Sequence, residues 1–252
     1  DTKSPTAGSR TRLNGSRLQT GGLVKLLAHR GQWWPTPARQ NCPEAVADAL
    51  ASGWGVEVDV WSVRDRRLVL RHDESSGEHE LTLPVLDRPI RASTPLFLHA
   101  KGGNDGFPER LFDAIRVGGW LDSTYVFCSP SNDAMLARMK AASVAVQTLV
   151  TVDDLDGLNV LLDLPEALGG ADGAWLEQPE ENWVSREVIA LLHSVEKSVW
   201  VVSPELHGRT LDLAWLDAWS GADGLVTDYP HLIERVLNRT DPVVHPKEPW
   251  WQ

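Results

Sequence analysis

The chain has 252 residues, of which 42% are hydrophobic and 23% are charged, a composition typical of a globular protein with a sizeable core. Its 35 acidic residues outnumber the 24 basic ones and give a formal net charge of -11, which argues against nucleic acid or an anionic membrane surface as a partner. No apolar run reaches the roughly 18 residues that a membrane span needs. Cys42 and Cys128 lie outside any CxxC pattern, which favours a reducing, cytoplasmic setting over a disulfide framework.

Short apolar runs alternate along the chain with segments of helical period. The runs that predict strands are 24–29, 55–61, 96–101, 125–130, 144–152, 173–178, 198–206 and 224–230. A helix is predicted over 43–53, where Pro43 suits the first helical position and Gly53 suits the end. Further segments with apolar residues three or four apart are 108–119, 132–142, 185–197, 211–221 and 231–239, while 158–170 is less regular because it contains Pro165.

A strand followed by a helix, repeated along the chain, predicts parallel strands joined by crossover helices. We therefore expect an α/β fold with a single (β/α)8 TIM barrel over residues 23–240, and a doubly wound open sheet is the alternative. Residues 1–22 are expected to form a flexible N-terminal tail and residues 241–252 a C-terminal tail. The 66–92 region breaks the rhythm, because it predicts an extended stretch and then a polar loop where the second helix belongs.

Titratable side chains gather at the ends of the predicted strands. Glu57 and Asp59 are two residues apart, hence on one face of a strand, and so are His99 and Lys101. Each of these pairs has a structural explanation taken singly, such as a solvated strand end. A parallel barrel strand is buried on both faces, however, so inward charges need partners, and a bound cation would remove the repulsion between the two carboxylates. Other candidates at strand ends are His29, Arg30, His72, Glu177, Glu205 and Asp228.

These residues predict a site for an anion beside a metal, with imidazoles able to move protons near neutral pH. The segments LLAHRG, QNCPEAV, GVEVDVWSVRDRRLVLRHD and LVTDYP, in this order and spacing, resemble the glycerophosphodiester phosphodiesterase family, which belongs to the phosphatidylinositol phospholipase C-like superfamily. The resemblance covers nearly the whole predicted barrel and itself implies a (β/α)8 fold. It implies that a small-molecule glycerophosphodiester is hydrolysed to glycerol 3-phosphate and an alcohol.

The resemblance also implies roles for individual residues. His29 and His72 would form the catalytic acid/base pair, and Arg30 would bind the phosphate. Glu57 and Asp59 would bind the metal, which in this family is usually Mg2+ or Ca2+. The chemistry agrees, because a phosphodiester monoanion resists nucleophiles unless a cation and a planar guanidinium take up charge on its nonbridging oxygens.

The third strand departs from the family pattern. Lys101 matches the family and is expected to offset phosphate charge, but His99 stands where the third metal ligand, a glutamate, is usual. We interpret this HAK ending as the mark of a divergent branch. A mixed nitrogen and oxygen site would let Mn2+, Zn2+ or Fe2+ compete better with Mg2+ or Ca2+. Three outcomes stay open: His99 binds the metal, Glu205 or Glu177 completes the coordination, or metal binding is lost.

Two other departures lie after the first and seventh strands. Gln40 takes the place of an acidic residue that the family usually has, and VVSPELHGR replaces a WTVN-like ending, which brings in Glu205 and His207. Glu205 is therefore counted among the predicted substrate contacts. Trp33 and Trp61 are also expected to contact substrate, with shielding of the barrel mouth as the alternative.

The expected function is metal-dependent hydrolysis of a glycerophosphodiester or a related sugar or polyol phosphodiester. One imidazole would accept a proton from the nucleophile and the other would protonate the leaving alkoxide. Two alternatives remain: a catalytically degenerate barrel that binds a phosphorylated ligand, and a lyase in which a neighbouring hydroxyl forms a cyclic phosphate. The sequence leaves open the leaving group, the metal and the oligomeric state.

Overall fold

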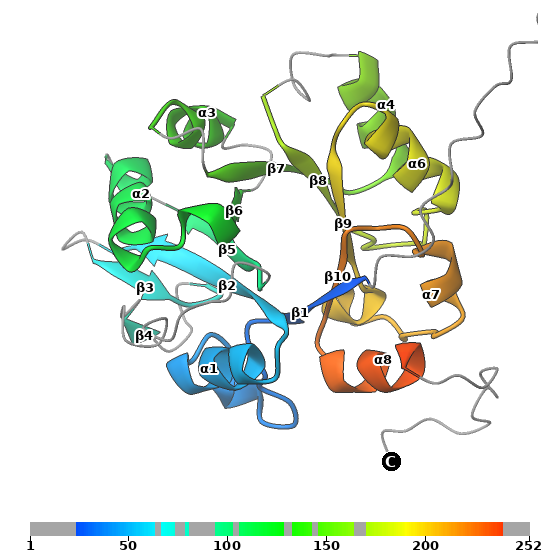
Figure 1. Cartoon of the computed structure of the whole chain (residues 1–252), viewed down its shortest axis with the longest axis horizontal. Helices are drawn as coiled ribbons and strands as arrows, with labels where there is room; N and C mark the ends of the chain where they lie inside the picture. Colours follow the sequence, from blue (N-terminus) through cyan, green and yellow to red (C-terminus); the bar gives the residue numbers. More distant parts are fainter. Residues whose placement is uncertain are drawn as a thin grey trace, which may run out of the picture.

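The computed structural model describes residues 24–63, 67–73, 79–80, 94–102, 106–128, 133–142, 146–163 and 170–238. Within these residues, eight parallel strands form a barrel: β1 (Lys25–His29), β2 (Gly55–Ser62), β5 (Leu96–Gly102), β6 (Thr124–Phe127), β7 (Gln147–Val152), β8 (Gly173–Leu176), β9 (Ser198–Val202) and β10 (Gly224–Thr227). Because β1 pairs with both β10 and β2, the ring is closed (Figure 1). The predicted TIM barrel is confirmed over the open sheet, and the two predicted tails lie outside the described residues.

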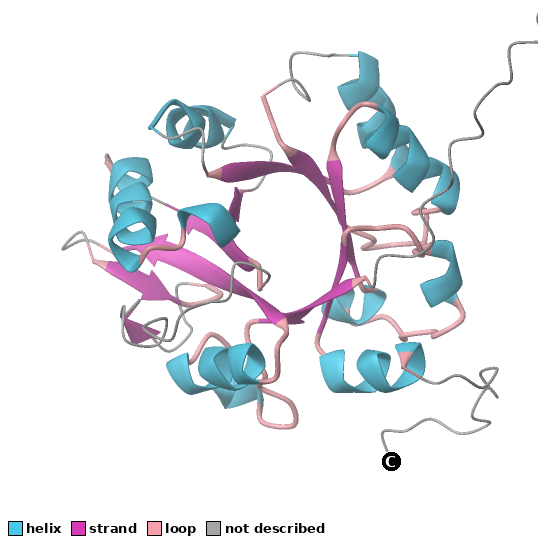
Figure 2. Ribbon diagram, in the orientation of Figure 1, coloured by secondary structure: helices cyan, strands magenta, loops and turns pink. Residues whose placement is uncertain are grey.

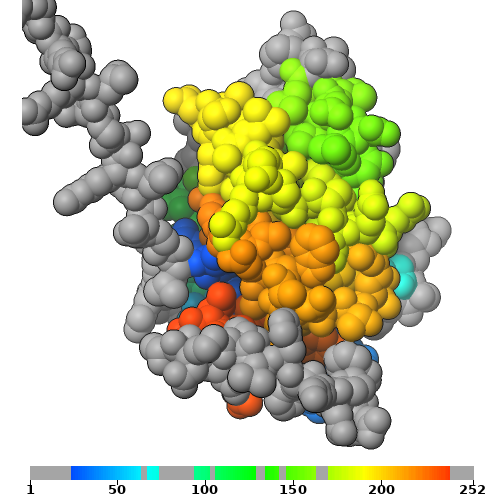
Figure 3. Space-filling model, turned by 90° about the vertical axis from the view of Figure 1, so that its right-hand side faces the viewer, coloured from blue at the N-terminus to red at the C-terminus, as the bar shows by residue number. Residues whose placement is uncertain are grey.

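Helices surround the barrel and cover the outer faces of its strands (Figure 2). They are α1 (Pro43–Ala51), α2 (Phe107–Gly118), α3 (Asp133–Ala142), α4 (Leu155–Asp163), α6 (Arg186–Ser194), α7 (Trp215–Ala218) and α8 (Pro230–Leu237), with short 3-10 helices η1 (Pro37–Arg39), η3 (Leu121–Ser123) and η5 (Pro204–His207). On the outer face in Figure 3, α6 is tied to α7 because Arg186 donates to the carbonyl of Asp217 at 2.9 Å. None of the described helices is long and apolar enough to cross a bilayer. The expected cytoplasmic location stays a prediction.

Two helices differ from the predicted ranges for local reasons. α4 begins before the predicted start at residue 158, because the carboxylate of Asp154 accepts a hydrogen bond from the backbone N–H of Gly157 at 2.6 Å and so satisfies a free N–H of the first turn. α7 covers only four residues of the predicted 211–221 segment. Asp212 holds the preceding turn by accepting from the backbone N–H of Ala214 at 2.9 Å, which competes with a helix at that point.

The connection from β2 to β5 contains no helix among the residues described. β3 (Leu68–Leu70) instead pairs antiparallel with β2, and β4 (His79–Glu80) pairs antiparallel with β3. The extended stretch predicted after residue 66 is confirmed by β3. The polar loop predicted to follow was wrong at β4, because the free edge of β3 offers hydrogen-bonding groups that a further strand can satisfy. The intervening residues 74–78 and the following 81–93 lie outside the described part of the chain.

Large aromatic side chains fill the barrel interior beneath its carboxyl-terminal mouth. Ring centroids of Phe97 and Trp200 lie 4.5 Å apart, those of Phe97 and Tyr125 lie 4.5 Å apart, and those of Tyr125 and Trp200 lie 5.1 Å apart. Gly224 makes room for this packing, since a Cβ there would lie 2.2 Å from the ring of Trp200. The interior is therefore a packed core and not a pore, which leaves the carboxyl-terminal mouth for polar side chains.

Replacing Trp200 by alanine is expected to lower the free energy of unfolding by about 3–5 kcal/mol, because the cavity would lie at the centre of this aromatic cluster. Trp200 is 1% exposed. Urea unfolding followed by circular dichroism measures the change. Val117→Ala is the matched control, since Val117 is 62% exposed and its truncation should alter stability by less than about 0.5 kcal/mol. Equal stabilities of the two variants would contradict the packing described above.

Candidate active site

At the carboxyl-terminal mouth, the barrel interior carries polar side chains from β1, β2 and β5. The register sets Asp59 of β2 beside His99 of β5, and Glu57 beside His29 of β1. Apolar neighbours such as Val58 are buried in the outer core between strands and helices. The period-two alternation that the sequence predicted therefore turns apolar residues toward the helices and polar ones toward the barrel axis.

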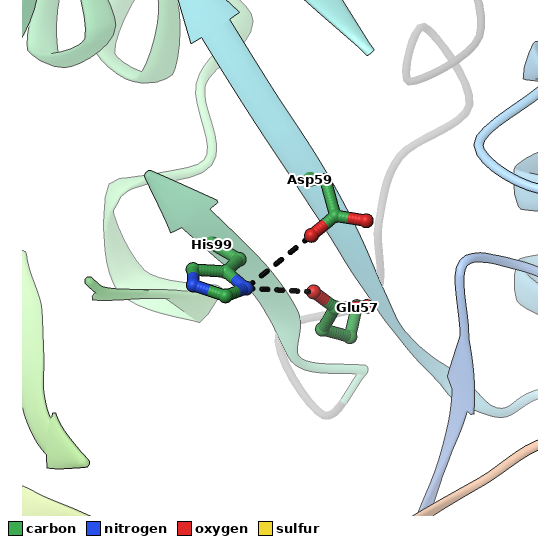
Figure 4. A group of neighbouring side chains, drawn as sticks. All are labelled: Glu57, Asp59 and His99. Atoms are coloured by element: carbon green, nitrogen blue, oxygen red, sulfur yellow. Dashed lines mark ion pairs between the residues drawn. The ribbon is translucent and has the colours of Figure 1, made fainter. Parts of the chain in front are cut away.

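Glu57, Asp59 and His99 converge on one point at the mouth (Figure 4). Nδ1 of His99 lies 3.3 Å from Oδ1 of Asp59 and 3.9 Å from Oε1 of Glu57. One potential ligand atom from each residue lies within 4.8 Å of the others. The carboxylates of Glu57 and Asp59 are only 2% and 1% exposed. The structure thus brings together the three residues that the sequence suggested as metal ligands.

The two buried carboxylates have unequal pKa values. Burial, together with the charge of Asp59, raises the pKa of Glu57 to about 7. Burial also acts to raise the pKa of Asp59, but a hydrogen bond from His99 and the charge of Arg30 outweigh it and hold that pKa below its usual range. Two like charges in one buried site produce this kind of splitting, and a nearby cation relieves it.

Asn41 orients Asp59, a role that the sequence analysis missed. Nδ2 of Asn41 donates to Oδ2 of Asp59 at 3.0 Å, and Oδ1 of Asn41 accepts from the backbone N–H of Asp59 at 3.0 Å. Asn41 is 2% exposed and has a φ of 58°, in the left-handed region that asparagine tolerates better than most residues. The available signals were its place in the loop just before Pro43 and in the QNCPEAV segment of the family resemblance, and neither reveals the partner.

Asn41→Ala is expected to lower the free energy of unfolding by about 2–4 kcal/mol. The backbone N–H of Asp59 would be buried without a partner, at a cost of about 1–3 kcal/mol, and alanine would be strained at this φ by about 1–2 kcal/mol. Urea denaturation measures the loss. Asn41→Gly is the control, because it removes the same hydrogen bonds without the strain and should lose less. Wild-type stability in the alanine variant would show that the reciprocal pair does not hold Asp59.

His29 is anchored by Asp228 at the end of β10. Oδ1 of Asp228 accepts from Nδ1 of His29 at 2.7 Å, and Nε2 of His29 lies 3.9 Å from Oε2 of Glu57. Burial acts to lower the pKa of His29, but the hydrogen bond to Asp228 and the charge of Glu57 outweigh it and raise that pKa. Tyr229 occupies the N-cap of α8, whereas Asp228 fixes the imidazole of His29.

Glu205 supports Asp228 and does not face open space. Its Oε1 accepts from the backbone N–H of Asp228 at 3.2 Å and from the hydroxyl of Thr227, while its Oε2 accepts from the hydroxyl of Ser203. Burial raises the pKa of Glu205. We interpret Glu205 as a positioning residue for Asp228, and through it for His29. Its predicted contact with substrate stays a prediction, and these hydrogen bonds compete with it.

Arg30 and Lys101 place positive charge on either side of Asp59. Nε of Arg30 lies 3.0 Å from Oδ2 of Asp59, and Nζ of Lys101 lies 3.5 Å from Oδ1. Nη1 of Arg30 donates to Oε1 of Gln40 at 3.1 Å. Gln40, where the family resemblance implies an acidic residue, therefore holds Arg30 through a neutral acceptor. More of the guanidinium charge is left for an anion than a carboxylate at that position would leave.

His72 lies at the rim, just after β3. Its side chain is 43% exposed, and Nδ1 lies 3.4 Å from Oδ2 of Asp73. Burial of part of the ring, followed by the charge of Arg30, lowers the pKa of His72. Arg30 is therefore close enough to act on both imidazoles of the predicted acid/base pair, since its charge also acts on His29.

The tryptophans predicted to contact substrate pack against the protein. Trp33 is 8% exposed and donates from Nε1 to the carbonyl of His29 at 3.0 Å. Trp61 lies beneath the guanidinium of Arg71, whose central carbon is 5.2 Å from the ring centroid. Contact of Trp33 and Trp61 with substrate stays a prediction, and this packing favours the alternative that they shield the barrel mouth. Trp34, by contrast, is 47% exposed.

Comparison with known proteins adds evidence on the fold. No protein-family model matches the chain, and no curated protein matches its sequence. Solved structures do match. A proposed glycerophosphodiester phosphodiesterase from Galdieria sulphuraria has a TM-score of 0.68 at 16% identity, covering 87% of this chain and 100% of its own. A glycerophosphoryl diester phosphodiesterase from Parabacteroides distasonis has a TM-score of 0.63 at 17% identity, covering 89% of each chain.

A third similar structure is a phosphodiesterase from Oleispira antarctica in complex with the product sn-glycerol 3-phosphate. It has a TM-score of 0.57 at 18% identity and covers 86% of this chain and 98% of its own. Identities this low show the fold alone. The chain therefore has the barrel fold of these phosphodiesterases, as the resemblance in its sequence implied.

Proposed function

We propose that this chain is a metal-dependent phosphodiesterase that hydrolyses a glycerophosphodiester or a related sugar or polyol phosphodiester. The observation that carries the proposal is the convergence of Glu57, Asp59 and His99 beside His29 at the carboxyl-terminal mouth of the barrel. Barrel enzymes place their chemistry at this face. The names of the similar structures, one of which holds sn-glycerol 3-phosphate, support the same reaction class.

The residues at the mouth fit a divalent cation. Two carboxylates and an imidazole offer oxygen and nitrogen donors on neighbouring strands, and the raised pKa of Glu57 reflects the cost of a second buried negative charge without a cation. The nitrogen donor favours Mn2+ or Zn2+ relative to the Mg2+ or Ca2+ that the family resemblance implies. When bound, such an ion supplies charge stabilisation for the phosphoryl oxygens.

The other side chains bind the phosphate and move protons. Arg30 and Lys101 would donate to the nonbridging oxygens and offset the charge that grows on them as water attacks phosphorus. As the bond from phosphorus to the leaving oxygen breaks, one imidazole of the pair His29 and His72 accepts the proton of the water and the other protonates the alkoxide. Asp228 keeps His29 oriented for its proton transfer.

Phosphorus NMR tests this function. Protein stripped with chelator and then supplied with Mn2+, Zn2+, Mg2+ or Ca2+ is incubated with glycerophosphodiesters, and we expect glycerol 3-phosphate and a free alcohol only when metal is present. A cyclic phosphate product would support the lyase instead. Calorimetric binding of a diester without turnover under any of the four metals would support the degenerate barrel, in which Arg30 and Lys101 balance the charge of Asp59.

A further inference from the structure

A second pair of titratable side chains, Glu177 and His207, lies at the mouth of the barrel. Glu177 directly follows β8 and His207 ends η5, which follows β9. Oε2 of Glu177 lies 2.8 Å from Nε2 of His207, and the two side chains are 20% and 23% exposed. Neither Glu177 nor His207 belongs to the candidate metal cluster or to the residues proposed to bind the phosphate.

The pair belongs to the same interior as the candidate metal site. The ring of His99 stacks on Phe127 with centroids 4.4 Å apart, and Phe127 stacks on Trp175 at 4.1 Å. Nε1 of Trp175 then donates to Oε1 of Glu177 at 2.7 Å. The charge of Glu177 also acts on the pKa of His99. In the strand order around the ring, β8, which Glu177 follows, lies opposite β2, which carries Glu57 and Asp59 (Figure 1).

Glu177 is held as a rigid hydrogen-bond acceptor. Its backbone N–H donates to the carbonyl of Val152 at 2.8 Å, and its own carbonyl accepts from Nε1 of Trp183 at 2.7 Å. Burial acts to raise the pKa of Glu177, but hydrogen bonds from His207 and Trp175 outweigh it and lower that pKa, so the carboxylate is charged at neutral pH. Each of its oxygens keeps a lone pair beyond the contacts described, and the partial exposure gives a ligand access.

The two sides of the mouth carry groups of opposite charge. Arg30 and Lys101 attract an anion on the side of β1 and β5, whereas Glu177, together with the neighbouring carboxylate of Asp153 at the end of β7, repels one. A diester whose phosphate lies at Arg30 would therefore turn one of its alcohol groups toward Glu177. An alcohol without a donor would displace water from the Glu177 carboxylate and give it no hydrogen bond in return. Such an alcohol would therefore bind more weakly.

We propose that the Glu177–His207 pair is the subsite for one alcohol group of the diester and selects alcohols that carry an O–H or N–H donor. The inference rests on the proposed phosphodiesterase function. Both kinds of alcohol donate a hydrogen bond to the carboxylate, a polyol through its hydroxyls and an amino alcohol through its ammonium group. A quaternary ammonium group has the same charge as the ammonium group of an amino alcohol but has no N–H.

Three chromogenic diesters separate these cases, because the p-nitrophenyl group that they share has no O–H or N–H donor and only the second alcohol differs. They are the p-nitrophenyl esters of phosphoglycerol, phosphoethanolamine and phosphocholine. We expect the protein to prefer one or both of the donor-bearing esters over the choline ester by about tenfold or more in kcat/KM, mainly through KM. Preference for glycerol would identify the polyol, and preference for ethanolamine would identify the ammonium group.

Glu177→Gln keeps the side-chain shape and the contact with Trp175 but removes the charge. The preference should fall to within about twofold in this variant and in His207→Ala, while the rate on the choline ester changes little. Glu180→Gln is the control, because Glu180 is an exposed carboxylate of the same loop and its loss should leave the preference intact. If the ion pair were purely structural, its loss would instead lower the melting temperature and leave the selectivity unchanged. That result would overturn the proposal.

Failure of the proposed function gives a different result from failure of the subsite. If none of the esters is turned over with any metal, the phosphodiesterase function fails, and calorimetry with the same three esters then decides the subsite. Tighter binding of a donor-bearing ester, lost in Glu177→Gln but kept in Glu180→Gln, supports it. Equal affinities for the three esters, or rates that fall equally on all three in Glu177→Gln, overturn it.

Discussion

Replacing His29 by glutamine is expected to lower kcat for diester hydrolysis by a factor of about 100 to 10,000 while leaving the Kd for the diester within a few-fold of the wild-type value. Nδ1 of His29 is committed to Asp228 at 2.7 Å, so Nε2 is the atom that can exchange a proton with substrate or water. Glutamine fills a similar volume and can keep the hydrogen bond to Asp228, but it cannot exchange a proton. Steady-state kinetics and calorimetric binding of a diester measure the two quantities.

His193→Gln is the matched control for His29→Gln. His193 lies on the outer helix α6 and pairs with Asp223 at 3.0 Å. His193→Gln therefore makes the same chemical change at a histidine that is also paired with an aspartate but is not part of the candidate active site. Its activity should equal that of the wild type. Asp228→Asn should fall between the two, because the imidazole keeps a neighbour but loses a charged acceptor. A His29→Gln variant within tenfold of wild-type kcat would remove this residue from the proton transfers.

The orientation of the site residues on β2 and β5 could be predicted because it follows from one periodicity. Glu57 and Asp59 are separated by Val58, and His99 and Lys101 by Ala100, so once the strands are buried on both faces the polar members must face the axis together. The same reasoning predicted the barrel, since most of the buried strands, though not β2, are followed by a helix. Both inferences use contacts between residues that are near in sequence or related by a regular repeat.

The supporting contacts could not be predicted, because they join irregular segments. Asn41 reaches Asp59 only because its backbone takes a positive φ, and no local pattern specifies which loop residue will do so. The contacts of Glu205 with donors at the end of β10 depend on the path of η5, which the sequence pattern does not specify. The approach of His207 to Glu177 likewise depends on the path of a loop. Side chains on loops are placed by tertiary packing, which a single sequence does not display.

The identity of the residue at position 99 is expected to decide which metal the site prefers. His99→Glu introduces the oxygen ligand that the family resemblance implies at this position, and we expect the affinity for Mg2+ or Ca2+ to rise relative to that for Mn2+ or Zn2+ by at least about tenfold. The change also adds a third carboxylate beside Glu57, whose pKa burial and Asp59 already raise to about 7. The metal-free variant should therefore unfold more easily, and added metal should recover more of its stability than in the wild type.

Calorimetric titration of the four metals into the wild type, His99→Glu and His99→Gln tests this prediction. Glutamine is the matched control, because it has the shape of glutamate and an oxygen donor but lacks the charge that would compensate a hard cation. If His99 is a ligand, His99→Gln should weaken Mn2+ and Zn2+ binding by at least about tenfold without improving Mg2+ binding. An unchanged order of affinities in all three proteins would mean that Glu57 and Asp59 hold the ion without position 99. The imidazole would then serve only as the hydrogen-bond partner of Asp59, which the 3.3 Å contact also allows.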